Sequence, residues 1–195
     1  MSQQDFDTAE LERLLAQTGA VRHGHFILSS GLHSPTYVQC ALLLQHPQHA
    51  ERVGRALARR LASLRPASVL SPALGGLIIG HEVARALRVP FRFTERQSGE
   101  MTLRRSFELK PRERVVVVED VITTGKSTRE TLEVARQLGA EPVAVGAILD
   151  RSGGVASFEV PFFSLLALTI PTYDPASGAP EPDWGPPEKP GSRPG

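Results

Sequence analysis

The chain is poor in cysteine, has no long apolar run and carries almost no net charge, and each absence excludes a class of protein. The one cysteine, Cys40, rules out an intramolecular disulfide and any metal site built from several cysteines. Because no base neighbours it in the sequence, we expect Cys40 to be a small buried residue. No stretch approaches the roughly 20 apolar residues of a membrane span. A net charge of +1 gives no general attraction to nucleic acid or to membranes.

The start of the chain and its composition both indicate a protein that stays inside the cell. Residues Met1–Thr8 carry acidic and amide side chains and lack the apolar core of a secretory signal. A length of 195 residues, with 41 % hydrophobic and 22 % charged residues, is ordinary for one well-buried domain. We therefore expect a cytoplasmic enzyme that binds neither nucleic acid nor a membrane.

The order of apolar patterns along the chain predicts an α/β fold. A first helix is expected to begin at Asp7 as N-cap, with Glu10 reaching back to it, and to end at Gly19. Three more helices are predicted: one that follows Pro47, one that runs from after Gly76 to about Leu87, and one over Ser127–Leu138. Strands are predicted over His25–Leu28, Tyr37–Cys40, Ser68–Ser71, Pro90–Thr94, Arg114–Glu119, Val143–Leu149 and Val160–Ile170. The later strands are apolar without alternation and are joined through helices, which indicates a parallel sheet covered on both faces.

The end of the chain differs from the rest in composition. Residues 174–195 contain seven prolines and four glycines, with a lone Trp184. Such a composition cannot bury a core, so we predict a disordered or loosely draped tail after a single domain that spans residues 1–173.

One segment in the middle of the chain concentrates the polar chemistry. The four valines of Val115–Val118 predict a buried central strand, and Glu119 and Asp120 follow at its carboxyl end. A short loop rich in hydroxyl side chains then leads into a helix that we expect Ser127 or Thr128 to cap. Ligands of open α/β sheets bind at this edge, so the segment is the first candidate for a binding site.

The residue types of this segment suit a phosphorylated sugar. Successive backbone N–H groups of Thr123–Ser127, at the positive end of the helix, can surround a phosphate, and Gly125 lets the backbone approach it closely. The carboxylates of Glu119 and Asp120 can accept hydrogen bonds from vicinal ribose hydroxyls. They also favour a bound divalent cation and a cationic transition state.

Three other interpretations compete for the same residues. An isolated pair such as Glu119 and Asp120 is most often a solvated strand end. The loop resembles the end of a Walker A phosphate loop, but that motif needs a glycine five residues before Gly125, where Asp120 stands. A dinucleotide fingerprint needs three spaced glycines, which are absent. The complete order of strand, acidic pair, hydroxyl-rich loop and helix is rarer than its parts and favours a site for a phosphorylated ribose.

The whole segment resembles the phosphoribosyl pyrophosphate (PRPP) motif of the type I phosphoribosyltransferases. This resemblance implies an α/β fold with a central parallel sheet flanked by helices, and a small N-terminal hood over about residues 20–45 that the C-terminal part of the core completes. It also implies a reaction that depends on Mg2+, which is expected to bind through PRPP with no direct protein ligand. In that reaction a nitrogen nucleophile displaces pyrophosphate at ribose C1 with inversion, through an oxocarbenium-like transition state. The implied PRPP-binding residues are Arg96, Glu119, Asp120, Val121, Ile122, Thr123, Thr124, Gly125, Lys126 and Ser127.

Other stretches resemble the orotate phosphoribosyltransferases of that family. The region from Gly24 to Tyr37 is similar to their orotate-binding hairpin, and Ala147–Arg151 is similar to their strand that ends in an arginine contacting the orotate carboxylate. A planar guanidinium suits that carboxylate through bidentate pairing. The alternative is a surface ion pair between Asp150 and Arg151. The resemblance implies orotate contacts from Phe26, Ser29, Thr123 and Arg151, and a pyrophosphate loop formed by Ala73, Leu74, Gly75 and Gly76.

The segment Arg92–Arg105 resembles the mobile loop that closes over PRPP in these enzymes. It places four arginines around Ser98 and Gly99, so a basic lid can fold over pyrophosphate. The resemblance implies that Arg96 is catalytic together with Asp120 and reaches the site of the other subunit in a homodimer. The alternative is a solvated hairpin whose arginines face water.

The sequence departs from the family pattern at several positions. Many members have lysine at Ser29, at Gly75 and in the mobile loop, where Gln97 stands here. Either the chain belongs to a shorter-loop branch in which arginines replace lysines, or its acceptor base differs. The histidines give no persuasive metal site, because His23 and His25 share one strand face without a third ligand.

We predict an orotate phosphoribosyltransferase that forms orotidine 5'-monophosphate in pyrimidine synthesis. A phosphoribosyltransferase for a purine or another pyrimidine is the alternative among enzymes of this kind, and a P-loop kinase is a more distant one. A PRPP-sensing regulator that binds nucleic acid is the alternative of another class, against which the near-neutral charge argues.

Overall fold

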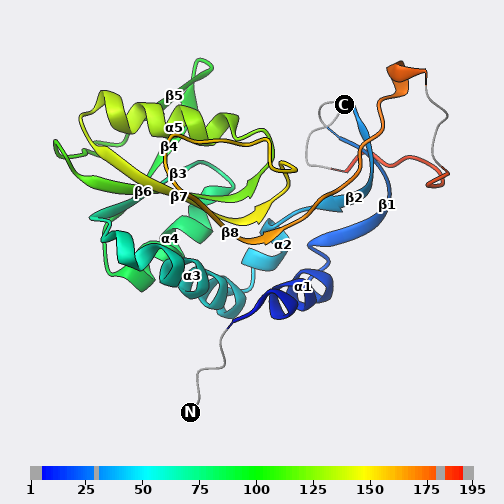
Figure 1. Ribbon diagram of the computed structural model, residues 1–195, viewed down its shortest axis with the longest axis horizontal. Helices are drawn as coiled ribbons and strands as arrows, with labels where there is room; N and C mark the ends of the chain where they lie inside the picture. Colours follow the sequence, from blue (N-terminus) through cyan, green and yellow to red (C-terminus); the bar gives the residue numbers. More distant parts are fainter. Residues whose placement is uncertain (1–5, 29–30, 179–182, 191–195) are drawn as a thin grey trace, which may run out of the picture.

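Two separate sheets organise the molecule, as Figure 1 shows. The computed structural model describes residues 6–28, 31–178 and 183–190. The helical segments are α1 (Thr8–Gln17), α2 (Ala41–Leu44), α3 (Pro47–Leu61), η1 (Ala62–Leu64), α4 (Gly76–Leu87), α5 (Lys126–Gln137) and η2 (Pro175–Ser177). The strands are β1 (Val21–Ile27), β2 (His33–Val38), β3 (Ser68–Pro72), β4 (Phe91–Gln97), β5 (Glu100–Leu103), β6 (Arg114–Ile122), β7 (Glu141–Asp150) and β8 (Phe162–Ala167).

The larger sheet confirms the predicted α/β class. Its strand order is β5-β4-β3-β6-β7-β8, and every neighbouring pair is parallel except the edge pair of β4 and β5. In Figure 1, α3 and α4 lie on one face of this sheet and α5 lies on the other. The sheet is therefore covered on both faces, as its apolar strands require.

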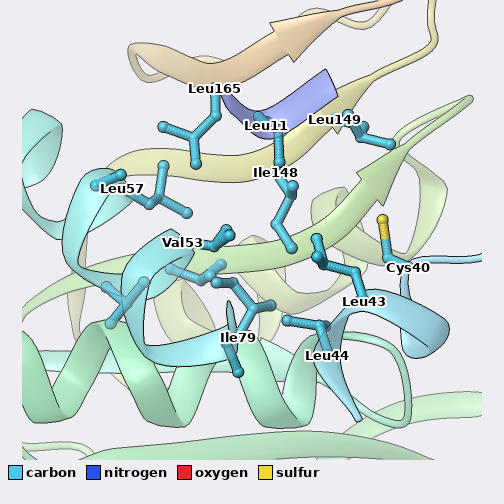
Figure 2. Close-up of a cluster of buried hydrophobic side chains, with 14 of the residues drawn as sticks. Leu11, Cys40, Leu43, Leu44, Val53, Leu57, Ile79, Ile148, Leu149 and Leu165 are labelled. Atoms are coloured by element: carbon cyan, nitrogen blue, oxygen red, sulfur yellow. The ribbon is translucent and has the colours of Figure 1, made fainter. Parts of the chain in front are cut away.

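The valine run in β6 shows how both faces become buried. Val116 and Val118 belong to the cluster that packs against α3 and α4, whereas Val117 belongs to the cluster under α5, and all three are fully buried. Successive side chains of a strand point to opposite faces, so a strand between two helical layers must be apolar at every position. Figure 2 shows the larger cluster, in which Ile79 and Ile148 lie near Val53 of α3, and the predicted buried residue Cys40 lies beside Leu43.

The smaller sheet is the antiparallel hairpin of β1 and β2, which we call the hood hairpin. It stands apart from the main sheet in Figure 1. Two segments from the end of the chain flank it: Tyr173 forms an isolated bridge with His33, and Glu188 forms one with Phe26. Residues 183–190 of the proline-rich tail therefore lie against the hood hairpin, a contact that their composition did not predict.

Several predicted boundaries need correction. β6 does not end at Glu119 but continues to Ile122, because Val121 and Ile122 still pair with Leu149 and Asp150 of β7. α5 is not capped by Ser127 or Thr128, since its N-cap is Gly125 and no side-chain cap bond forms. At α1, Asp7 caps as predicted by accepting from the Glu10 N–H at 2.7 Å, but the Glu10 carboxylate pairs with Arg52 rather than reaching back.

Among the described residues, no helix combines the length and the apolar character that crossing a membrane would need.

Candidate active site

The acidic pair lies inside the main sheet near the carboxyl end of β6. Glu119 is opposite Ala147 of β7 and is 8 % exposed. Its carboxylate accepts from the Asp120 N–H at 3.3 Å, and the Asp120 carboxylate accepts from the Val121 N–H at 2.8 Å. Within the described part of the chain, neither carboxylate has an ion-pair partner. The pair is therefore no solvated strand end: it is buried and lacks positive charge.

Burial of the two carboxyl groups shifts the protonation of both. Burial raises the pKa of Glu119 to about 9, and the neighbouring charge of Asp120 adds to that effect. Burial also raises the pKa of Asp120. A carboxylate pair in this condition gains most from a ligand that brings hydroxyl donors or a cation, because both favour the ionised form.

Glu119→Gln is expected to stabilise the ligand-free protein at alkaline pH. A carboxyl whose folded pKa lies above its unfolded value contributes stability that is full below the unfolded pKa, here the usual 4.5, and is lost as pH rises toward about 9. Glutamine cannot ionise, so the variant should exceed the wild type in free energy of unfolding by at least about 1 kcal/mol at pH 8. Urea unfolding of both proteins at pH 5 and pH 8 measures this, and a difference that does not grow with pH would contradict it.

The loop after β6 turns into α5 at Gly125. Gly125 has a φ of 71°, and a Cβ there would lie 3.0 Å from the Phe158 ring, so glycine is required for both conformation and space. The Thr124 side chain accepts from the Lys126 N–H at 3.3 Å, and Arg129 donates to the Thr124 carbonyl at 2.7 Å. The following N–H groups of α5 have no partner within the helix, as in any first turn, and can bind an anion.

Arg151 lies directly beside this loop. Its backbone N–H donates to the Ile122 carbonyl at 2.8 Å, which places it next to Thr123. The Asp150 carboxylate accepts from the Ser152 N–H at 2.8 Å and forms no ion pair with Arg151 among the described residues, so the surface ion pair is not what forms here.

The Arg151 side chain is partly buried and short of acceptors. Its Nε is buried and has no hydrogen-bond partner in the described parts of the chain. Burial lowers the pKa of Arg151, and Cys40 and Tyr37 are near enough to oppose that effect. A buried guanidinium with an unused donor is suited to an anionic ligand, and Tyr37 brings the hood hairpin to the same place.

The pyrophosphate loop predicted at residues 73–76 lies against the acidic pair. It joins β3 to α4, and the Ala73 N–H donates to the Thr94 carbonyl at 2.7 Å. A Cβ on Gly75 would lie 2.6 Å from the Asp120 Oδ1, and one on Gly76 would lie 3.3 Å from the Glu119 Oε1. Leu74 is 82 % exposed at the tip of the loop. The structure thus brings the loop and both carboxylates together.

The four arginines of the predicted lid lie on or beside the β4–β5 hairpin, and each contacts an acidic residue. Arg96 pairs with Glu130 of α5 and also donates to the Gly99 carbonyl at 2.8 Å. Arg92 pairs with Glu113 at 2.8 Å, and Glu95 receives Arg105 at 3.1 Å and Arg104 at 3.9 Å. The alternative interpretation as a hairpin thus describes the shape seen here, although its arginines face carboxylates as well as water. The role of Arg96 at PRPP stays a prediction.

The hood hairpin gives a mixed outcome for the predicted base contacts. Phe26 is only 1 % exposed, and its ring packs against Tyr37 with centroids 5.7 Å apart. Ser29 lies outside the described residues. The sequence interpretation missed a companion for His33, whose Nδ1 lies 2.7 Å from the His25 Nε2. It also assigned no contact to Tyr37 or Phe158, because only the folded chain brings them to Arg151 and Gly125.

Comparisons with known proteins agree with this geometry. The family model of the phosphoribosyl transferase domain matches residues 41–159. An orotate phosphoribosyltransferase of Thermotoga maritima is 49 % identical over 183 residues, which cover 94 % of this chain and 98 % of that protein. One from Desulforamulus reducens is 49 % identical over 185 residues, covering 94 % and 96 %. The solved orotate phosphoribosyltransferase of Aeropyrum pernix superposes with a TM-score of 0.69 at 29 % identity, covering 81 % of this chain and 93 % of that one.

Proposed function

This chain belongs to the phosphoribosyltransferase family, and on that premise we propose that it transfers the 5-phosphoribosyl group of PRPP to orotate, giving orotidine 5'-monophosphate and pyrophosphate in de novo pyrimidine biosynthesis. The observation that carries the choice of base is the similarity to orotate enzymes over nearly the whole chain. It is supported by the Arg151 Nε, which lies beside the loop after β6 and has no hydrogen-bond partner among the described residues.

The residues divide the reaction between them by position. The loop of Thr123–Ser127 would hold the 5-phosphate, and the carboxylates of Glu119 and Asp120 would accept from the ribose hydroxyls. Orotate nitrogen N1 then forms a bond to ribose C1 and gives up its proton to solvent, as the bond from C1 to the pyrophosphate oxygen breaks and that oxygen leaves with the electron pair. The two carboxylates stabilise the positive charge that develops on the ribose, while Arg151 orients the anionic base.

A Mg2+ requirement is part of the proposal. The described residues contain no group of three or more side chains able to hold a metal ion by themselves, so the ion would enter with PRPP. Glu119 and Asp120 would suit an ion delivered in this way, because they are buried carboxylates with raised pKa values and have no cationic partner among the described residues. When bound, Mg2+ would neutralise charge on the leaving pyrophosphate.

We further propose a cytoplasmic homodimer in which Arg96 of one subunit serves the site of the other. To do so, Arg96 must break its ion pair with Glu130, and this ion pair is exposed and therefore weak. The closed position of the β4–β5 hairpin would replace that pair with contacts to pyrophosphate.

A single assay tests the function. Purified protein with PRPP and Mg2+ is expected to consume orotate, which is monitored as a loss of orotate absorbance. It is expected not to use adenine, hypoxanthine or uracil. Addition of excess EDTA should abolish the orotate signal, and excess Mg2+ should restore it. Consumption of a purine or of uracil in place of orotate would overturn the choice of base. Turnover unaffected by EDTA would overturn the metal requirement alone.

A further inference from the structure

The hood hairpin needs support from outside itself. It contains only β1 and β2, and it is not hydrogen-bonded into the main sheet. A two-stranded hairpin alone is marginally stable in water. If this hairpin forms one wall of the base site, its order depends on whatever flanks it.

Two later segments of the chain supply that support. On the β2 side, His33 and Tyr173 exchange two backbone hydrogen bonds of 2.8 and 2.9 Å. On the β1 side, the Glu188 N–H donates to the His25 carbonyl at 2.7 Å, and the Ile27 N–H donates to the Glu188 carbonyl at 2.8 Å. The hairpin is therefore held by an isolated backbone bridge on each side, and the tail segment of residues 183–190 runs against it (Figure 1).

The side chain of His25 also binds the tail segment of residues 183–190. The imidazole is 4 % exposed, and its Nδ1 lies 2.7 Å from the Gly185 carbonyl. Because a carbonyl only accepts, Nδ1 must carry the proton and donate it. The other ring nitrogen, Nε2, bonds to His33 at 2.7 Å, and the Trp184 indole lies edge-on with its centroid 5.6 Å from the His25 ring.

Strand β1, which carries His25, continues into the candidate base site. Phe26 follows His25, its ring packs against Tyr37, and Tyr37 lies near enough to Arg151 to act on its charge. A shift of β1 would therefore displace Phe26 and Tyr37 relative to Arg151. The phosphate loop and the acidic pair belong to the other sheet, so such a shift leaves them in place.

We propose that residues 183–190, here called the clasp strand, position the base-binding wall of the hood, with His25 as the positioning residue that fastens them. The proposal rests on the proposed function, because it assigns the clasp strand to the base and not to PRPP. It predicts that loss of the clasp strand weakens orotate binding selectively.

Truncation separates the clasp strand from the residues beyond it. A chain ending at Gly178 is expected to raise the KM for orotate by about 10-fold or more, since an unfastened wall must be ordered again at each binding event, and to change the KM for PRPP by less than about 2-fold. The matched control ends at Pro190, keeps the clasp strand and should behave as the wild type. Equal changes in both KM values, or no change in either, would overturn the proposal.

Single substitutions keep the proposal testable if the truncated chain does not fold. His25→Ala should reproduce the selective rise in the orotate KM. His25→Asn places an amide donor near the position of Nδ1, so it should recover part of the loss by restoring the bond to Gly185. If the alanine and asparagine variants were equally impaired, the bond to Gly185 would have no positioning role.

Trp184 provides a readout that does not depend on turnover. It is the one tryptophan of the chain and sits on the clasp strand against His25. Acrylamide quenching of its fluorescence should increase in His25→Ala and decrease in the wild type when orotate is added, because coupling between two binding events is reciprocal. Quenching that ignores both changes would overturn the clasp, even in a protein that uses orotate. If the wild type failed to use orotate while His25→Ala still unmasked Trp184, the proposed function would fail and the fastening by His25 would stand.

Discussion

Asp120→Ala is expected to lower kcat/KM for PRPP by about 100- to 1000-fold, the size of effect typical of losing one group that stabilises transition-state charge. The carboxylate lies beside the pyrophosphate loop, against Gly75, and no described cation neutralises it. It is thus available both to the ribose hydroxyls and to the positive charge that develops at C1. Alanine removes these interactions and leaves β6 paired with β7 through its backbone.

The measurement is steady-state kinetics with PRPP varied at saturating orotate. Glu133→Ala is the matched control, because it removes an exposed carboxylate of α5 that contacts Gln137 and Arg136, and it should change kcat/KM by less than about 2-fold. The unfolding temperature of Asp120→Ala should be no lower than that of the wild type, since a buried carboxylate without an ion-pair partner among the described residues has been removed. A variant with wild-type kinetics would remove Asp120 from the site.

Arg151→Ala is expected to raise the KM for orotate by about 100-fold and to leave the KM for PRPP within about 3-fold, because a charge-assisted bidentate pair contributes on the order of 2–3 kcal/mol. Its Nε has no hydrogen-bond partner in the part of the chain that the structure describes, so it can take part in such a pair. Arg151→Lys should recover little, since an ammonium cannot reproduce the planar fork of two donors.

Arg136→Ala is the control for this second variant. Arg136 is a cation in the last turn of α5, at the opposite end of the helix from Gly125, and it pairs with the exposed Glu159 of the β7–β8 connection at 2.8 Å. Its loss should leave both KM values unchanged. If Asp120→Ala and Arg151→Ala each weakened both substrates to the same extent, the separate assignment of ribose and base would be wrong.

The sequence predicts the sheet well because β6 and β7 are apolar at nearly every position, and such strands are stable only between two layers of helices. It predicts their ends less well. Where β6 stops depends on how far β7 runs beside it, and where α5 begins depends on Gly125, whose left-handed conformation places the cap earlier than the nearby hydroxyl residues suggest. Both are properties of partners and backbone geometry that no local pattern encodes.

The residues of the site also differ in how far the sequence can predict them. Glu119, Asp120 and the loop after them are contiguous, so a motif can identify them, and the structure places the pyrophosphate loop against them. The contact between His25 and Gly185 joins residues 160 positions apart, in a tail whose composition indicates disorder. Only the hairpin that the tail covers gives those prolines and glycines a surface to pair with.

Gly75 has a consequence for the proton balance of substrate capture. With no side chain at this position, no positive group among the described residues compensates the buried pair, and Glu119 holds its proton at neutral pH. A substrate that delivers a cation and hydroxyl donors needs the ionised form, so that proton must depart to solvent on binding. On the proposed function, capture of PRPP should therefore release a proton, and the apparent affinity should climb with pH up to about 9.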